Sequence, residues 1–279
     1  MIDLIDIEDI SIISDWVELS VAYSNEPLSR AKLVSLLEGN GFQKDVDYDE
    51  DSLFDSVIHE LQRRQALYGA TPPFIVENNI VIPQAAWDDR PEYFMCLLFS
   101  YWGAANAGNG TQLFERISNI VLKSYLNGEA VNLGFPNEGD LPGQLDQIAT
   151  IVCEDRAAIN PPTAAKDRGV DVVGWLGCGD DRKGQVIVLM QCAAGRNWSL
   201  KKRIMLDVWS QYINWNFYTT VPSLSITEVV ETKHWSEAIV EYGVVFDRAR
   251  IFKYLYKPTI TVDAALRAEI IEWCSHKMN

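Results

Sequence analysis

Apolar residues recur at helical spacing through the first hundred positions of the chain. The pattern predicts helices over residues 10–23, 29–37, 53–67 and 92–102, and it places Ser29 at the N-cap of the second helix. Before the last of these helices, short apolar runs on either side of Glu77-Asn78-Asn79 predict a β-hairpin over residues 73–83. The first part of the chain is therefore expected to be mostly helical.

Strand-like and helix-like patterns alternate after residues 104–110, a segment of small residues where we place a domain boundary. Two β-branched runs, 169–175 and 185–191, flank a turn rich in glycine and charge, so they predict an antiparallel hairpin. Further strands are expected over 130–135, over 225–232 and at the start of 243–255. Helices are expected over 111–126, 141–155, 201–217, the second half of 243–255 and 262–276, with Thr111, Asp247 and Asp263 as N-caps of three of them. This order predicts an α/β (α+β) fold for residues 109–279, behind a helical domain of residues 1–108.

One acid and one amide face each other in the predicted hairpin. Asp171 stands near the start of the first strand and Gln191 at the end of the second, so antiparallel pairing brings them to the same edge of the sheet. An unpaired charge inside an apolar strand is costly, and a metal bound by both side chains satisfies it. The alternative is an ion pair of Asp171 with Lys166, Arg168 or Arg196, with Gln191 as an edge amide whose hydrogen bonds are satisfied.

A run of positive charge follows the second strand of the hairpin. No acid occurs between Asp181 and Asp207, and the cations without a nearby acid are Arg182, Lys183, Arg196, Lys201, Lys202 and Arg203. This excess is typical of a phosphate-binding surface, although a solvated helix face has the same composition. Beyond it, Trp209, Tyr212 and Trp215 are expected to pack in the core, with base stacking as the alternative.

The acid and amide on neighbouring strands resemble the PD-(D/E)XK, or restriction-endonuclease-like, nuclease superfamily over about residues 112–206. In that superfamily an Asp on one strand and E-x-K or Q-x-K on the next bind a divalent metal, which activates water against a phosphodiester. The resemblance implies a mixed central sheet flanked by helices. It also implies Mg²⁺ or Mn²⁺ bound by Glu115, Asp171 and Gln191. Glu115 matches the acid that the first core helix often contributes, and a solvated acid in the first turn of that helix is the alternative.

The chain departs from the superfamily's pattern at one position. Ala193 stands where the motif lysine is expected, and Lys201 or Lys202 is expected to supply the missing charge. We therefore predict Asp171, Gln191 and Lys201 as catalytic residues. The nucleic acid is expected to contact Arg196, Lys201, Lys202 and Arg203.

Two functions follow from this resemblance. The first is a metal-dependent endonuclease that hydrolyses DNA phosphodiester bonds in a bacterial restriction or antiphage defence system. The second is a catalytically inactive nuclease-like subunit that acts as a binding or scaffold component of a multiprotein defence complex, which Ala193 and the neutral Gln191 favour. The sequence does not decide between DNA and RNA.

Charge is distributed unevenly along the chain. Of the net charge of −15, residues 1–110 contribute most, with 19 acids against 6 Lys and Arg, while residues 111–279 hold 20 acids against 18. Two helices followed by a hairpin are typical of a winged-helix module, but an acidic surface repels DNA. We therefore expect the N-terminal domain to contact a protein partner.

Several other functions are excluded by missing motifs. The chain has no G-x-S-x-G elbow, no P-loop and no Rossmann fingerprint. Five scattered cysteines fit a reducing compartment, and the acidic first ten residues are unlike a signal peptide. No apolar run approaches the ~20 residues that span a bilayer. We expect a cytoplasmic protein that does not enter a membrane, and its oligomeric state stays open.

Overall fold

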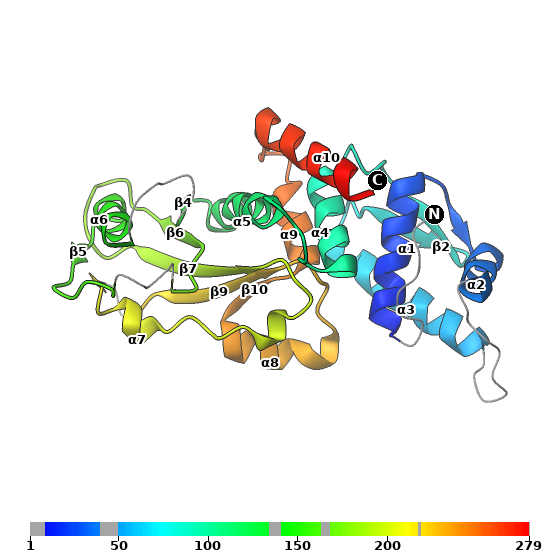
Figure 1. The fold of residues 1–279 in the computed structure, drawn as a ribbon, viewed down its shortest axis with the longest axis horizontal. Coiled ribbons are helices and arrows are strands. Elements are labelled where there is room, and N and C mark those ends of the chain that lie inside the picture. The colour runs from blue at the N-terminus through cyan, green and yellow to red at the C-terminus, as the bar shows by residue number, and fades with distance from the viewer. Residues whose placement is uncertain (1–8, 40–49, 134–140, 163–167, 217–218, 279) are drawn as a thin grey trace.

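The computed structural model describes residues 9–39, 50–133, 141–162, 168–216 and 219–278. A five-stranded sheet with helices on both faces forms one end of the molecule, and the N-terminal helices with a small three-stranded sheet form the other (Figure 1). This mixture of helices and a mixed sheet confirms the predicted α/β (α+β) class. Among the described residues, no helix combines the length and the apolar composition needed to cross a membrane.

The N-terminal part follows the predicted order of helices and hairpin. It contains α1 (Ile10–Ser24), β1 (Leu28–Ser29), α2 (Arg30–Gly39), α3 (Glu50–Tyr68), β2 (Phe74–Glu77), β3 (Ile80–Pro83) and α4 (Pro91–Trp102). Strands β2 and β3 pair antiparallel through a two-residue turn at Asn78 and Asn79, which both have positive φ, as such a turn requires. The Ser29 hydroxyl accepts a hydrogen bond from the backbone N–H of Lys32, which confirms the predicted cap of α2.

The remaining elements build the sheet and its covering helices. They are α5 (Gly110–Leu126), β4 (Glu129–Asn132), α6 (Leu141–Ile151), β5 (Asp155–Arg156), β6 (Val172–Leu176), β7 (Val186–Ala193), the 3₁₀ helix η1 (Trp198–Leu200), α7 (Leu206–Trp209), β8 (Ile213–Asn214), β9 (Val221–Ile226), α8 (Thr232–Tyr242), β10 (Val244–Phe246), α9 (Arg248–Leu255) and α10 (Ala264–Met278). The caps of α9 and α10 are the predicted Asp247 and Asp263.

The large sheet has the strand order β10-β9-β7-β6-β4. Strands β4, β6 and β7 pair antiparallel, whereas β9 runs parallel to β7 and β10 runs parallel to β9. The predicted hairpin of β6 and β7 is confirmed, with Val172 opposite Met190. Strand β7 therefore lies in the middle of the sheet, and its last three residues, Gln191 to Ala193, extend beyond the final pair with β6 and pair with β9.

The two faces of the sheet follow from the alternation of side chains along each strand. Val172, Val188 and Met190 belong to the core that includes α5 and α9, whereas Val173 and Leu189 belong to a second core with α6 and residues 204–213. Helix α8 covers the same second face over β9 and β10 (Figure 1). The site described below lies where these layers meet at the end of β7.

One apolar core runs through both parts of the chain. It joins residues of α1, α3 and α4 to residues of α5, α9 and α10. Helix α10, the last of the chain, packs across α4 and α5, on both sides of the predicted boundary at residues 108 and 109 (Figure 1). The division into two domains stays a prediction, and the packing shows that the two parts share buried surface.

Several predicted elements are wrong in detail. Residues 201–217 do not form one helix, because η1 ends at Leu200 and Lys201 has an extended backbone. After the single turn of α7, β8 pairs with β5 instead. Trp209 and Tyr212 are buried as predicted, so tertiary contacts override the local helical pattern there. Helix α6 ends at Ile151, before the predicted residue 155, because Cys153 has a positive φ of 55°.

Three further differences concern the ends and the number of elements. Helix α5 begins at Gly110 with Asn109 as its N-cap residue and no capping side chain, so Thr111 is not the cap. Strand β9 begins at Val221 and ends at Ile226, earlier than the predicted 225–232. Helix α8 was not predicted, and the predicted end of the strand over 130–135 lies outside the described residues.

Candidate active site

A pocket of about 340 Å³ lies at the edge of the sheet where β6 begins and β7 ends. Four predicted residues line it, namely Glu115 from α5, Asp171 just before β6, Gln191 from β7 and Lys201 just after η1. These side chains come from four different segments. The structure therefore places them together, and their catalytic and metal-binding roles stay predictions.

Asp171 and Gln191 meet through the pairing of their strands. The pairing of β6 with β7 ends at Val172 and Met190, and Asp171 and Gln191 are the next residues beyond that pair. The backbone N–H of Asp171 donates to the carbonyl oxygen of Met190 at 2.8 Å, and its Oδ2 accepts from the backbone N–H of Cys192 at 2.6 Å. The carboxylate is thus fixed against the end of β7 by a charge-assisted hydrogen bond.

Gln191 is held in the pocket wall with an unused acceptor. Its side chain is buried, and Oε1 has no hydrogen-bond donor among the residues that the structure describes. Gly169, with φ of +78°, lies so close that a Cβ there would be 3.0 Å from Nε2 of Gln191. An unsatisfied buried carbonyl oxygen costs about 1–3 kcal/mol. For this oxygen, the alternative of a satisfied edge amide finds no donor within the described part of the protein.

The pKa of the Cys192 thiol depends on burial and on the charged residues of the pocket. Burial raises its pKa well above the ordinary value, the negative charge of Asp171 raises it further, and Glu115 adds to the same effect. Lys201 acts in the opposite direction. The thiol therefore stays protonated and is not a nucleophile, although three of the four pocket residues influence it.

The segment that carries Lys201 is fixed by two side chains. The hydroxyl of Tyr242 donates toward the carbonyl oxygens of Lys201, Ser199 and Trp198, at 3.0, 3.1 and 3.4 Å. The indole N–H of Trp198 donates to Glu228 Oε2 at 2.7 Å. Lys201 is solvent-exposed and lines the pocket, so it is accessible to a ligand there.

The other predicted nucleic-acid contacts lie outside the pocket lining. Arg196, Lys202 and Arg203 are all exposed on the same segment. Ala193, at the position of the expected motif lysine, is buried against apolar residues of β9 and α8. Lys201 is therefore the predicted basic residue that reaches the pocket.

The ligand set of the pocket is mixed. Among the described residues, no group of three or more His, Cys, Asp and Glu is placed to hold a metal ion. Glu115 and Asp171 supply two carboxylates, and the third oxygen donor of the predicted set is the amide of Gln191. Such a set has one negative charge fewer than three carboxylates.

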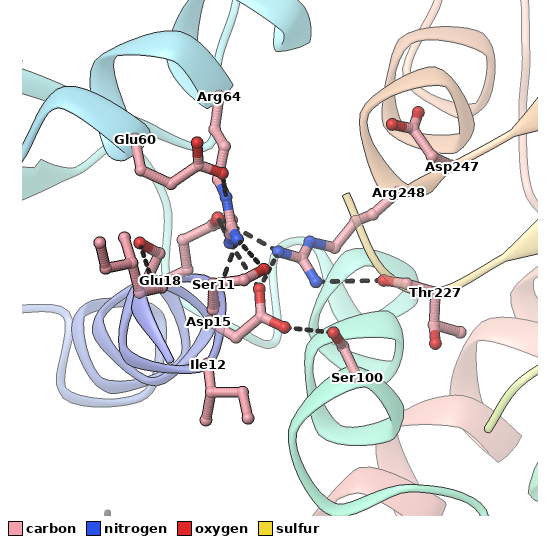
Figure 2. Close-up of polar contacts among 12 residues, drawn as sticks. Ser11, Ile12, Asp15, Glu18, Glu60, Arg64, Ser100, Thr227, Asp247 and Arg248 are labelled. Carbon is pink, nitrogen blue, oxygen red and sulfur yellow. Dashed lines mark hydrogen bonds and ion pairs between the residues drawn. The ribbon is translucent and has the colours of Figure 1, made fainter. Parts of the chain in front are cut away.

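A buried network of charges behind the pocket was missed by the sequence analysis. Arg64 of α3 and Arg248 of α9 converge on Asp15 and Glu18 of α1, and all four are buried (Figure 2). Arg248 lies 2.5 Å from Asp15 and 3.2 Å from Glu18, while Arg64 contacts the same oxygens at 2.5 and 2.8 Å. Only the placement of two acids within the apolar face of α1 could have indicated it.

Further groups complete this network. Tyr68 and Tyr93 both donate to Glu18 Oε2, and Ser100 donates to Asp15. Burial alone would raise the pKa of Asp15, but the charges of Arg248 and Arg64 outweigh it and lower the pKa to about 2. The acid is therefore ionised at neutral pH, as the two arginines require.

The network is linked to the pocket wall through the end of β9. Arg248 donates through Nη1 to the carbonyl oxygen of Thr227 (Figure 2). The backbone N–H of Arg248 donates to the carbonyl oxygen of Glu228. The Thr227 hydroxyl donates in turn to the carbonyl oxygen of Ala194, and Glu228 holds Trp198. Both Ala194 and Trp198 line the pocket.

Comparison of the chain with protein-family models, with curated proteins and with solved structures gives no match. The site is therefore interpreted from its own geometry and chemistry.

Proposed function

We propose that this protein is a metal-dependent endonuclease that hydrolyses DNA phosphodiester bonds. The observation that carries the proposal is the common pocket of Glu115, Asp171, Gln191 and Lys201. Two carboxylates, a neutral oxygen donor and a lysine are the groups that such a reaction needs. An Asp before one strand, an amide at the end of the next and a Glu on the preceding helix also support the resemblance to the PD-(D/E)XK nucleases.

The pocket residues fit a small divalent cation. Carboxylate and amide oxygens are the donors that Mg²⁺ and Mn²⁺ prefer. Oε1 of Gln191 is a buried carbonyl oxygen in need of a partner, and a bound cation supplies one. We infer that Glu115, Asp171 and Gln191 hold the ion. Its chemistry when bound is to polarise the phosphate and acidify a water molecule.

Each pocket residue then has a distinct task. Asp171, fixed by the N–H of Cys192, keeps a negative charge at the end of β7. Lys201 places a positive charge at the rim, where it stabilises charge that develops on the phosphate. The exposed Arg196, Lys202 and Arg203 attract and orient the nucleic-acid backbone.

The biological setting belongs to the same proposal. The resemblance favours a role in bacterial restriction or antiphage defence, in the cytoplasm. The strongly acidic N-terminal part, with its winged-helix-like order of helices and hairpin, is suited to a protein partner rather than to DNA.

A second candidate function is supported by one observation. Ala193 is buried where the motif lysine is expected, so catalysis depends on a lysine from an exposed segment. If Lys201 does not engage the phosphate, the protein is a catalytically inactive binding or scaffold subunit that retains the nuclease fold.

Plasmid cleavage separates the two functions. With Mg²⁺ or Mn²⁺, the protein is expected to nick supercoiled plasmid, and Asp171→Asn is expected to lower the rate on the order of 100-fold. Asp180→Asn is the matched control, because Asp180 lies in the β6–β7 turn and pairs locally with Arg182. Mn²⁺ should also raise the melting temperature of the wild type and not that of Asp171→Asn. Absence of both nicking and Mn²⁺ stabilisation would establish the inactive subunit instead.

A further inference from the structure

An exposed leucine is the direct neighbour in sequence of a residue that lines the pocket. Leu200, the last residue of η1, is 80% exposed, and it directly precedes Lys201, which lines the pocket. A single exposed apolar side chain is ordinary on a protein surface. Leu200 differs from such residues in where it stands and in how firmly its backbone is held.

The backbone around Leu200 is fixed on both sides. The N–H of Leu200 donates to the carbonyl oxygen of Asn197 at 3.1 Å, and the N–H of Lys201 donates to that of Trp198 at 3.0 Å. The Tyr242 hydroxyl lies within hydrogen-bond distance of the carbonyl oxygens of Ser199 and Lys201, the residues before and after Leu200. The side chain is therefore presented to solvent from a hydrogen-bonded turn, and little backbone conformational entropy is lost when it binds.

Positive charge surrounds the leucine along the chain. Arg196 precedes it, Lys201, Lys202 and Arg203 follow it, and all are exposed. Met205, at 57% exposure, is the next exposed apolar residue of the segment. An apolar side chain between cations is complementary to a ligand that has apolar stacked groups between anionic groups. The base pairs and phosphates of a nucleic-acid duplex have this arrangement.

We propose that Leu200 is a wedge that inserts between adjacent base pairs of duplex DNA beside the pocket, an inference that rests on the proposed function. Leucine is among the side chains that proteins insert between base steps, and insertion kinks the duplex at a cost of a few kcal/mol. The kink brings the phosphodiester next to the opened step towards the recessed carboxylates. The flanking cations bind the phosphates on either side.

A membrane surface is the other ligand that attracts cations beside an apolar side chain. Stable contact with a bilayer needs a broad apolar face, as on an amphipathic helix. The segment offers one turn of 3₁₀ helix and an extended stretch, with two exposed apolar side chains. That small area and its place at the carboxylate pocket favour the base stack.

Unwinding of a closed plasmid tests the proposal without knowledge of a preferred DNA sequence. The full chain carries Asp171→Asn and divalent metal ions are left out, so that the DNA stays intact. It is bound to relaxed plasmid, topoisomerase I is added, and the linking number is measured after the protein is removed. Insertion unwinds the duplex, so the bound protein is expected to leave the plasmid negatively supercoiled.

Three further substitutions, each in the Asp171→Asn background, identify the wedge. Leu200→Ser is expected to return the linking number to that of the protein-free control while the salt dependence of duplex binding is kept. Lys202→Ala is expected to reduce the slope of log K against log salt by about 1 and to keep the unwinding per bound protein. Val240→Ser is the matched control, because Val240 is 85% exposed on α8 and outside the basic segment. It should change neither quantity.

The outcomes separate the wedge from the nuclease function. Unwinding that persists in Leu200→Ser, or duplex binding without unwinding, overturns the wedge and leaves plasmid cleavage as an independent test. Absence of duplex DNA binding would contradict both the endonuclease function and the wedge. Binding to phosphatidylserine-containing vesicles that Leu200→Ser abolishes, without unwinding of plasmid, assigns the leucine to a membrane surface and also overturns the wedge.

Discussion

At the scale of single residues, one carboxyl group joins the pocket wall to the buried charges. Glu228 is partly buried, holds the indole of Trp198 and lies beside Arg248. Burial raises the pKa of this carboxyl to about 7, with Asp15 adding to the rise and Trp198, Arg248 and Arg196 opposing it. The group is therefore about half ionised at neutral pH, next to a segment on which Lys201 depends.

The raised pKa of Glu228 predicts a pH dependence of protein stability that Glu228→Gln removes. Between about pH 4.5 and 7 the unfolded chain releases the Glu228 proton while the folded chain keeps it, so stability falls as pH rises through this window. Glu228→Gln keeps an acceptor for Trp198 and has no charge to desolvate. Urea unfolding should find the variant more stable than wild type by about 2 kcal/mol at pH 8, after allowance for solvent screening, and nearly equal at pH 4.5.

The control for this measurement is Glu231→Gln, because Glu231 is only partly buried and pairs with the exposed Lys233. Its stability should follow the wild-type pH curve. Parallel curves for wild type and Glu228→Gln would show that the carboxyl has an ordinary pKa in the folded state.

At the scale of elements, the site depends on how closely α5 approaches β6. A Cβ at Gly174 would lie 2.6 Å from Cδ2 of Leu122, so glycine allows the helix to pack directly on the strand. The same helix carries Glu115, and the same strand follows Asp171. The distance between helix and strand therefore sets how the two carboxylates share the pocket.

A methyl group at this contact is expected to push the two elements apart. Gly174→Ala should destabilise the protein by about 1–3 kcal/mol in urea unfolding, as overpacking of a close contact does. Adding Leu122→Ala makes room for the new methyl group. The double variant should therefore lose less unfolding free energy than the two single variants lose together. Additive effects would show that the helix and strand are not in close contact at Gly174.

The elements also show what sequence patterns can and cannot provide. The hairpin of β6 and β7 and the juxtaposition of Asp171 with Gln191 were predictable, because antiparallel pairing is a local rule of geometry. The segment after β7 was not, because Tyr242 and Glu228, distant in sequence, hold it in a non-helical course. The apolar spacing around Trp209 indicates which side chains are buried. It does not determine whether the backbone there is helical.

At the scale of the whole molecule, the contact between the two parts of the chain contains buried ion pairs as well as apolar side chains. Arg248 comes from the helix after β10, while its partners Asp15 and Glu18 come from the first helix (Figure 2). A pattern of residues gives no sign of such a contact, because its partners are more than two hundred positions apart. Replacing a whole buried ion network by apolar groups is often harmless, but removing one member leaves an uncompensated charge.

Arg248→Met is therefore expected to cause a large loss of stability, and a second substitution identifies the cause of that loss. The variant leaves Asp15 and Glu18 facing Arg64 alone, so we expect a loss of about 3–5 kcal/mol in urea unfolding. Arg116→Met removes an arginine from a partly exposed pair with Glu269 and should cost no more than about 1 kcal/mol. If charge is the cause, Arg248→Met combined with Asp15→Asn recovers part of the loss, because the remaining acid is balanced by Arg64. If lost packing of the arginine stem is the cause, the double variant is no more stable than Arg248→Met, and the network contributes shape rather than charge to the contact between the two parts.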